Sequence, residues 1–365
     1  MSGVYISWPF CAQKCTFCNF ASGVQPKGLE DEYAEALVRE IEAHQWLWTP
    51  DTTYLGGGTP SAMPVEKLER ILSRIPGRPW REATIESAPG GLSSERVTAW
   101  KSVGINRVSL GVQSFVKAEL ARTGRRHDAV VVEREIALLR AAGIPNINVD
   151  LIAGLPGQTE ASWRESLSWI GKLNPPHVSV YMLEVDEDSR LGAELLNGGI
   201  RYGASDVPSD DAIAAFYEIA VAELSRIGIA RYEISNFALP GAESIHNLKY
   251  WRREPYIGFG ADAHSFDGAL RWQNVETARD YVKDWYATQN VRAESTGAQS
   301  DEEKFFVGLR LAEGVETNPA DWQRFGPAFE RFIALGMMEQ IGARVRLTSR
   351  GVMVSNEIFQ EFIAA

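Results

Sequence analysis

The three cysteines of this 365-residue chain all lie between positions 11 and 18, and this clustering constrains the protein more than any other feature. They are Cys11, Cys15 and Cys18, spaced C-x3-C-x2-C shortly after the apolar residues 4–6. A structural zinc site closes with four protein ligands, and no other Cys or His is near enough in the sequence to be the fourth. A disulfide would leave one thiol over. A [4Fe–4S] cluster usually takes four cysteines, so three predict a cluster with one iron open to a ligand that is not protein.

Composition and charge restrict the class of protein. The length of 365 residues suits one large domain or a large and a small one, and with 45% hydrophobic residues the chain can bury a sizeable core. No segment has the roughly 18 unbroken apolar residues of a spanning helix, and residues 1–4 lack the pattern of a signal peptide. The net charge of −11 disfavours nucleic acid as a partner. We expect a cytoplasmic protein, with at most peripheral membrane contact, in a reducing compartment where a cluster survives.

Strand-like and helix-like segments alternate through the first 230 residues. Strands are expected at residues 3–7, 52–55, 83–86, 107–110, 147–151 and 178–182, and helices at 31–48, 65–75, 95–103, 130–142 and 162–173. This alternation predicts a parallel sheet with right-handed crossovers. Six strands are too few for a closed eight-stranded barrel, so we predict an α/β fold with a partial (β/α)6 barrel.

The remaining segments differ from this pattern. Residues 186–210 are expected to be a long polar excursion. Helices are expected at residues 302–311, 319–325, 327–335 and 349–362, with a β-hairpin over 338–347 that turns at Gly342. We therefore predict a core over residues 1–295, with a ligand-facing extension at 186–290, and a winged-helix-like module over 296–365 that packs on the core or covers it.

Polar and glycine-rich features follow successive predicted strands. In order after the cysteine loop they are Gly57, Gly58 and Thr59, then Glu86, Gln113 and Asp150. Because the carboxyl ends of parallel strands share one rim, we expect these residues to meet there.

Each of these features has a structural interpretation and a functional one. A glycine run can be a tight turn, and a carboxylate or amide can be a satisfied loop residue. Three glycines also let a ligand approach closely, and their N–H groups could hold a carboxylate or phosphate. Strand-end carboxylates could accept ribose hydroxyls or an ammonium group. The neighbouring cysteine loop favours the ligand interpretation.

The cysteine spacing resembles the signature of the radical S-adenosylmethionine (SAM) superfamily, including an aromatic residue, Phe17, before the last cysteine. The resemblance implies that the methionine end of SAM binds the open iron. Electron transfer from the cluster would then split SAM into methionine and a 5′-deoxyadenosyl radical. It also implies a set of SAM-binding residues: Tyr5, Phe17, Gly57, Gly58, Thr59, Glu86, Gln113, Arg125 and Asp150.

Further motifs resemble the oxygen-independent coproporphyrinogen oxidase group of that superfamily. They include residues 4–11, 54–61, 111–115, 150–156 and 231–238, and the C-terminal segments 308–314 and 346–348. The porphyrin decarboxylases of the group carry a fourth cysteine two positions after the third, where this chain has Phe20, and a longer N-terminal arm. The chain is more similar to the heme chaperones of the group, the HemW type.

The heme-chaperone resemblance depends on residues 246–251, which match an H-N-x-x-Y-W motif. A histidine can ligate heme iron, and aromatic rings can stack on a porphyrin, so His246, Tyr250 and Trp251 are candidate heme contacts. From the residues alone, a histidine before an aromatic pair more often belongs to core packing, and it is the resemblance that favours heme contact. His127 and His264 also match histidines of these relatives. Asp262 stands where a glycine is usual, which adds a carboxylate near the expected pocket.

The resemblance implies a chaperone that binds a [4Fe–4S] cluster, SAM and heme and passes the heme to an acceptor hemoprotein, such as a respiratory one. It also implies a reductant such as flavodoxin or ferredoxin, and it is compatible with a homodimer. One alternative is the oxidative decarboxylation of coproporphyrinogen III. Another is a radical SAM methyl or methylene transferase, and a third is a cluster-bearing scaffold without turnover.

Overall fold

Parallel strands in sequence order form the centre of the computed structural model, which describes residues 2–297 and 300–363. They are β1 (Gly3–Trp8), β2 (Thr52–Gly57), β3 (Glu82–Ser87), β4 (Arg107–Gln113), β5 (Asn146–Ala153) and β6 (His177–Met182). Each matches a predicted strand, so the parallel α/β sheet is confirmed. The residues of these strands are mostly buried, as is typical of a parallel sheet.

The sheet is wider than predicted. The strands added beside β1 are β9 (Tyr256–Phe259), β10 (His264–Phe266), β11 (Leu270–Asn274) and β12 (Arg292–Gly297), and β8 (Asn236–Ala238) and β7 (Ala230–Arg231) extend the other edge beyond β6. Strand β9 runs parallel to β1, whereas β10, β11 and β12 are antiparallel to their neighbours. Within the described residues the sheet has 12 strands, so the six-stranded prediction covered its centre alone.

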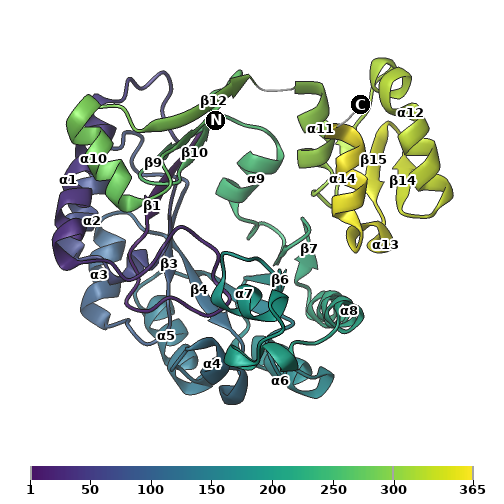
Figure 1. The fold of residues 1–365 in the computed structure, drawn as a ribbon, viewed down its shortest axis with the longest axis horizontal. Helices are drawn as coiled ribbons and strands as arrows, with labels where there is room; N and C mark the ends of the chain where they lie inside the picture. Colours follow the sequence, from purple (N-terminus) through teal and green to yellow (C-terminus); the bar gives the residue numbers. More distant parts are fainter. Residues whose placement is uncertain (1, 298–299, 364–365) are drawn as a thin grey trace.

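The helices between the central strands pack on the outer side of the sheet (Figure 1). They are α1 (Lys27–Ala43), α2 (Val65–Leu72), α3 (Ser94–Ser102), α4 (Lys117–Thr123), α5 (Ala129–Ala141) and α6 (Glu160–Leu173), with a 3-10 turn η1 (Pro60–Ala62). The prediction that α1 continues to residue 48 was wrong, because His44 has an extended backbone with ψ 129°. Helix α4 was not predicted.

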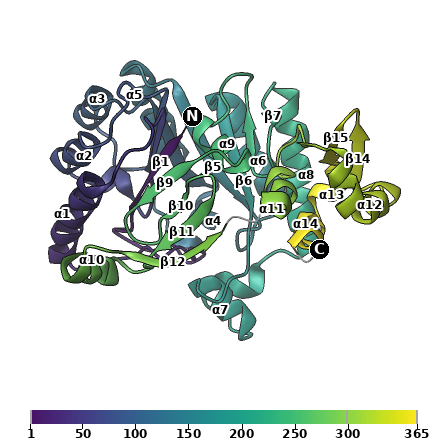
Figure 2. The same ribbon diagram turned by 90° about the horizontal axis from the view of Figure 1, so that it is seen from above.

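The predicted polar excursion contains regular structure. It holds α7 (Arg190–Leu196) and the 3-10 segment η2 (Arg201–Asp206), and it leads into α8 (Asp210–Arg226). Figure 2 shows α7 projecting from the body of the molecule. The backbone N–H of Leu191 donates to the carbonyl of Thr16 at 2.8 Å, so this excursion is fastened to the cysteine loop.

The C-terminal module lies to one side of the sheet (Figure 1). Its elements are α11 (Ser300–Gly308), β13 (Val315–Glu316), α12 (Pro319–Ala334), β14 (Met338–Ile341), β15 (Arg344–Leu347), α13 (Ser349–Val352) and α14 (Ser355–Ile363). The hairpin is confirmed, with φ 60° at Gly342. Two helix predictions were wrong: α12 continues through Pro327, and residues 349–362 form two helices rather than one. The boundary at residue 295 stays a prediction.

Two ion pairs join this module to separate parts of the sheet. Glu303 of α11 pairs with Arg271 of β11 at 2.7 Å, and Arg310 pairs with the buried Glu233, after β7, at 3.5 Å. Because β11 and β7 lie toward opposite ends of the strand order, the module connects both sides of the incomplete barrel.

Two helices remain, α9 (Ile245–Trp251) and α10 (Ala278–Thr288). Helix α10 packs beside α1 (Figure 1), and Tyr281 lies 4.8 Å from the ring of Tyr33. Across residues 2–297 and 300–363, every helix is too short or too polar to span a bilayer.

Candidate functional site

The cysteine loop connects the carboxyl end of β1 to α1 and closes on itself. The N–H of Cys11 donates to the carbonyl of Gly23, and the N–H of Gly23 donates to that of Pro9, both at 3.0 Å. Cys11, Cys15 and Cys18 are free thiols and are all partly buried. These hydrogen bonds therefore fix the conformation of the loop at the rim of the barrel.

The segment after α4 holds the far side of this loop. The N–H of Thr16 donates to the carbonyl of Thr123 at 3.3 Å, and the Gln13 amide donates to the carbonyl of Gly124 at 3.0 Å. These bonds bring Arg125 beside the cysteines, although it is 110 positions away from Cys15 in sequence.

Hydrogen-bond donors face the sulfur atoms of all three cysteines. Nε of Arg125 lies 3.0 Å from Sγ of Cys15, and the Thr59 hydroxyl lies 3.7 Å from Sγ of Cys11. Burial raises the pKa of the Cys18 thiol, and a hydrogen bond from the backbone of Phe20 opposes this shift. Donors of this kind stabilise thiolates and tune iron–sulfur clusters.

The donor set fits a [4Fe–4S] cluster rather than a single metal ion. Among the described residues, no three Cys, His, Asp or Glu side chains converge as they would around one ion. A cluster spreads its thiolates over several irons, so such convergence is not needed. Phe20, where the porphyrin decarboxylases carry a further cysteine, is 65% exposed and supplies no ligand.

The glycine run after β2 packs directly against the segment that leads to Cys11. The N–H groups of Gly58 and Thr59 donate to the carbonyls of Trp8 and Phe10, both at 2.9 Å. A side chain at Gly58 would place its Cβ 2.7 Å from the Phe10 oxygen, so only glycine fits. The amides of Gly58 and Thr59 are therefore occupied, and the role of this run in holding a carboxylate or phosphate stays a prediction. The carbonyl oxygens of the run can accept from an amine.

Two carboxylates point into the barrel beneath the rim. Burial, reinforced by the neighbouring charge of Asp150, raises the pKa of Glu86 to about 7, and the Tyr54 hydroxyl donates to Glu86 at 2.9 Å. Burial also raises the pKa of Asp150, which accepts from Ser109 and Asn148 at 3.0 and 2.7 Å. Paired buried carboxylates can bind an ammonium group or sugar hydroxyls.

Gln113 lies at a strained position on the same rim. Its φ is +70°, an uncommon value for a residue other than glycine, and it follows an irregular register between β4 and β5. Its Oε1 is buried without a hydrogen-bond partner in the structure. Strain and an orphaned polar atom together are typical of a ligand site.

Tyr5 and Phe17 complete the predicted SAM-binding set. The Tyr5 ring stacks on Tyr54 with centroids 6.1 Å apart, and a Cβ at Gly56 would lie 3.1 Å from its hydroxyl. Phe17 is partly buried within the cysteine loop. The structure therefore brings the predicted cluster and SAM residues to one rim and the barrel interior beneath it.

His246 lies at the opposite end of the barrel. It is fully buried, its Nδ1 lies 2.9 Å from the Thr52 hydroxyl, and its Nε2 lies 2.8 Å from the Tyr250 hydroxyl. Burial lowers the pKa of His246 to about 3, and Glu82, at the start of β3, accepts from its backbone N–H at 2.9 Å. Helix α9 therefore covers the amino ends of the strands. These contacts do not support the predicted heme role of His246.

Trp251, His127 and His264, which the sequence also singled out, differ in how exposed they are. The indole N–H of Trp251 is buried and Arg310 lies 4.4 Å from the centre of its ring, so one face of the ring is covered, and the predicted heme contact of Trp251 stays a prediction. His127 is buried, with Nε2 3.1 Å from the Val112 carbonyl. His264, on β10 after the rim loop that follows β9, is exposed.

Sequence reasoning missed several polar residues inside the barrel. Tyr54, Ser109, Asn148, Ser179 and Tyr181 share the interior with the two carboxylates; Asn148, for example, donates to Ser179 at 2.9 Å. The strand assignments could have revealed these residues, because every second residue of a strand faces the same side. Tyr54, for example, is two positions before Gly56.

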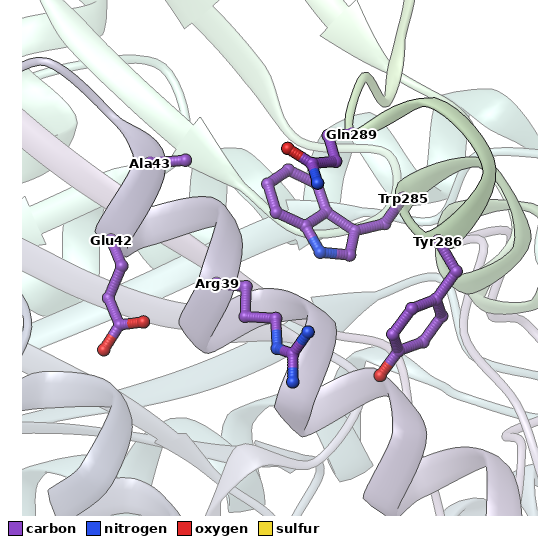
Figure 3. Close-up of a pocket in the computed structure, with 6 residues that line it drawn as sticks. All are labelled: Arg39, Glu42, Ala43, Trp285, Tyr286 and Gln289. Carbon is purple, nitrogen blue, oxygen red and sulfur yellow. The ribbon is translucent and has the colours of Figure 1, made fainter.

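A separate hollow lies on the outside of the molecule. It has a volume of about 460 Å³ and lies between α1 and α10, lined by Arg39, Glu42, Ala43, Trp285, Tyr286 and Gln289 (Figure 3). Its lining contains no cysteine and no rim residue, so it is not part of the cluster site.

The parallel sheet and the three-thiol loop at its rim define a radical SAM protein, and the Radical SAM superfamily model matches residues 5–170. The chain is 33% identical to the heme chaperone HemW of Lactococcus lactis, over 99% of this chain and 97% of that protein. It is also 33% identical to HemW of Bacillus subtilis, over 100% and 99%. The chain belongs to this HemW heme chaperone family, whose superfamily implies a [4Fe–4S] cluster and SAM.

A solved structure shares the whole fold. It is the coproporphyrinogen III oxidase HemN of Escherichia coli, described as a radical SAM enzyme, with a TM-score of 0.85. The match covers 100% of this chain and 90% of that one at 21% identity. At this identity the likeness concerns the fold, including the C-terminal module.

Proposed function

We propose that this protein is a heme chaperone that binds a [4Fe–4S] cluster, SAM and heme and delivers the heme to an acceptor hemoprotein. The observation that carries the proposal is the end-to-end similarity to HemW proteins together with the three-thiol loop. The electron for the cluster would come from a flavodoxin- or ferredoxin-type donor.

The rim residues would divide the recognition of SAM among them. Cys11, Cys15 and Cys18 would hold the cluster, which supplies a Lewis-acidic iron and a source of one electron. Carbonyl oxygens of residues 57–59 would accept from the ammonium group. Glu86 and Asp150 would bind the ammonium or the ribose hydroxyls, and the Gln113 Oε1, which is buried without a partner, would accept from the nucleoside.

The exposure and the hydrogen bonds of each histidine indicate which of them could ligate heme. A heme ligand needs an imidazole nitrogen that can reach the iron, and both nitrogens of His246 are engaged inside the protein. His264 is the one exposed histidine, and it lies near the rim. The neighbouring Asp262 accepts from Gln273 at 2.7 Å. We therefore propose that heme approaches the rim, beside the SAM site, and that His264 is the better candidate ligand.

Heme titration tests this proposal. The anaerobically reconstituted protein should bind one equivalent of heme with a shifted Soret band, and wild type that binds none would overturn the chaperone function. His264→Ala and His246→Ala form a matched pair. We expect His264→Ala to change the Soret band more, provided that far-UV circular dichroism shows both variants folded. The opposite ranking would assign the ligand to His246.

An enzymatic alternative has its own assay. The HemN fold is shared, so the reduced protein with SAM is incubated anaerobically with coproporphyrinogen III. We expect no vinyl product, and formation of protoporphyrinogen IX would replace the chaperone proposal with a decarboxylase. Formation of S-adenosylhomocysteine alongside 5′-deoxyadenosine would instead indicate a methyl or methylene transferase.

A further inference from the structure

The geometry points to Arg125 as the residue that raises the reduction potential of the cluster, through a charged hydrogen bond to the sulfur of Cys15. The inference rests on the proposed function, because it requires a cluster on the three cysteines. It assigns Arg125 a positioning and electrostatic role that is separate from any contact with SAM.

The contact with Cys15 is short and charged. Nε of Arg125 lies 3.0 Å from Sγ of Cys15, well within the range of an N–H to sulfur hydrogen bond. The donor at Cys11 is the neutral Thr59 hydroxyl at 3.7 Å. Among the described residues, Cys15 is the one thiol for which a hydrogen bond from a charged side chain is found. A guanidinium is always protonated, so this donor is always charged.

The backbone of Arg125 is fixed relative to the loop. Its N–H donates to the Leu120 carbonyl at 2.9 Å, closing the end of α4, and Gly124 adopts φ +84°. The Gln13 amide donates to the Gly124 carbonyl at 3.0 Å, and a Cβ at Gly124 would lie 2.6 Å from that amide. The turn that presents Arg125 and the loop that presents Cys15 are therefore one connected unit.

The other end of the guanidinium faces the barrel interior. A Cβ built on Gly111 would lie 3.6 Å from Nη2 of Arg125 and 3.2 Å from the Gln113 amide nitrogen. The same positive charge acts to lower the pKa of Asp150. Arg125 therefore spans from the cluster thiol to the pocket, and the absence of a side chain at Gly111 leaves room for it.

The expected effect follows from charge. Reduction adds one electron to the cluster, taken from an external donor, and no bond forms or breaks. The added negative charge is shared by the thiolates, so a charged N–H donor at Cys15 stabilises the reduced state more than the oxidised one. A charge-assisted hydrogen bond shifts an equilibrium by about tenfold or more.

Potentiometric titration followed by EPR tests the inference. Wild type, Arg125→Gln, Arg125→Lys and the neighbouring exposed Arg126→Gln are reconstituted anaerobically and titrated with dithionite and mediators, with SAM omitted. Omitting SAM removes any effect of altered SAM binding. At the wild-type midpoint, we expect the ratio of reduced to oxidised cluster to fall about tenfold in Arg125→Gln. Arg125→Lys should fall less, and Arg126→Gln should match wild type.

Iron and sulfide content separates the two proposals. A wild-type protein that takes up no cluster would overturn the proposed function itself. Arg125→Gln with a full cluster and the wild-type potential would overturn the role of Arg125 alone. If Arg125→Gln loses its cluster, Arg125→Lys, which keeps the charge, decides the result.

Discussion

Nδ1 of His246 lies 2.9 Å from the hydroxyl of Thr52, the first residue of β2. The glycine run, residues 56–58, lies at the other end of the same strand, which finishes at Gly57. The two motifs that resemble the family most visibly therefore lie at opposite ends of one strand. The cysteines and glycines form the rim, whereas the histidine motif closes the base, where a Cβ on Gly3 would be only 3.0 Å from the imidazole.

Replacing the buried imidazole should destabilise the barrel. His246→Ala leaves the Thr52 and Tyr250 hydroxyls without partners and opens a cavity beneath Gly3. We expect the free energy of unfolding in urea to fall by about 2–4 kcal/mol. His264→Ala, at an exposed position, is the control and should change stability by about 0.5 kcal/mol or less. Equal effects of the two substitutions would contradict the conclusion that His246 packs the amino ends of the strands.

Each cysteine should be essential for the cluster. Cys11→Ser, Cys15→Ser and Cys18→Ser each remove one of the three protein thiolates, and the chain has no other cysteine to replace it. We expect iron content and visible absorbance after reconstitution to be lost in every variant. Phe20→Cys can be added to each of these variants. It should not restore the cluster, because the side chain at position 20 is exposed.

The central fold was predictable because it depends on local patterns. Strands β1 to β6 are short apolar segments separated by turns, so their alternation with helices specified a parallel sheet. Several of the added strands were not recognised because they are short: β8 has 3 residues and β9 has 4. The longer β12, with 6 residues, is exposed along its whole length and so lacks the apolar pattern of a buried strand. Helix α12 continues through Pro327 because Phe325, Phe329 and Phe332 bury one stripe against the module core, which local proline chemistry does not reveal.

The rim was predictable for a related reason, and the base was not. A residue at the carboxyl end of a parallel strand lies close to the rim, so Glu86 could be placed from the strand assignment, whereas Asp150 lies deeper because β5 continues to Ala153. The path of the chain through residues 239–251 is set by tertiary contacts, such as the hydrogen bonds that the Ser244 hydroxyl and the His246 backbone N–H donate to Glu82. The sequence of α9 therefore could not show which end of the barrel it covers.

The affinity for SAM should depend on pH through Glu86. Its pKa of about 7 means that a carboxylate is mostly protonated at pH 6 and mostly ionised at pH 8. If ionised Glu86 binds the ammonium or ribose of SAM, the dissociation constant should fall by about tenfold over this interval. Equilibrium dialysis of the reconstituted protein measures it. Glu86→Gln should bind weakly with little pH dependence, and an unchanged profile would exclude this role.

The attachment of the C-terminal module should depend on Glu303. Its carboxylate is buried and accepts from Nε and Nη2 of Arg271 at 2.8 and 2.7 Å. Glu303→Gln should reduce the free energy of unfolding by about 2 kcal/mol or more and increase hydrogen exchange in α11. Glu339→Gln, which breaks an exposed pair with Arg346, is the control and should cost at most about 1 kcal/mol.

Glu40 should give the stability of the barrel a distinct pH dependence. Burial raises the pKa of this α1 carboxyl to about 7, although it accepts hydrogen bonds from Tyr281, Gly260 and Asn274. A folded-state pKa above the unfolded value means that the folded protein binds the proton more tightly. The stability that this proton contributes is therefore complete below about pH 4.5 and is lost as pH rises toward 7.

Glu40→Gln removes this ionisation, so its unfolding free energy relative to wild type should rise with pH. We expect the difference to grow by about 2 kcal/mol between pH 5.5 and pH 8, measured by urea unfolding at each pH. Glu42→Gln, on the exposed side of the same helix and paired with Arg74, should show no such trend. A constant difference for Glu40→Gln would mean that the buried carboxyl keeps its ordinary pKa, because its three hydrogen bonds offset the loss of solvation.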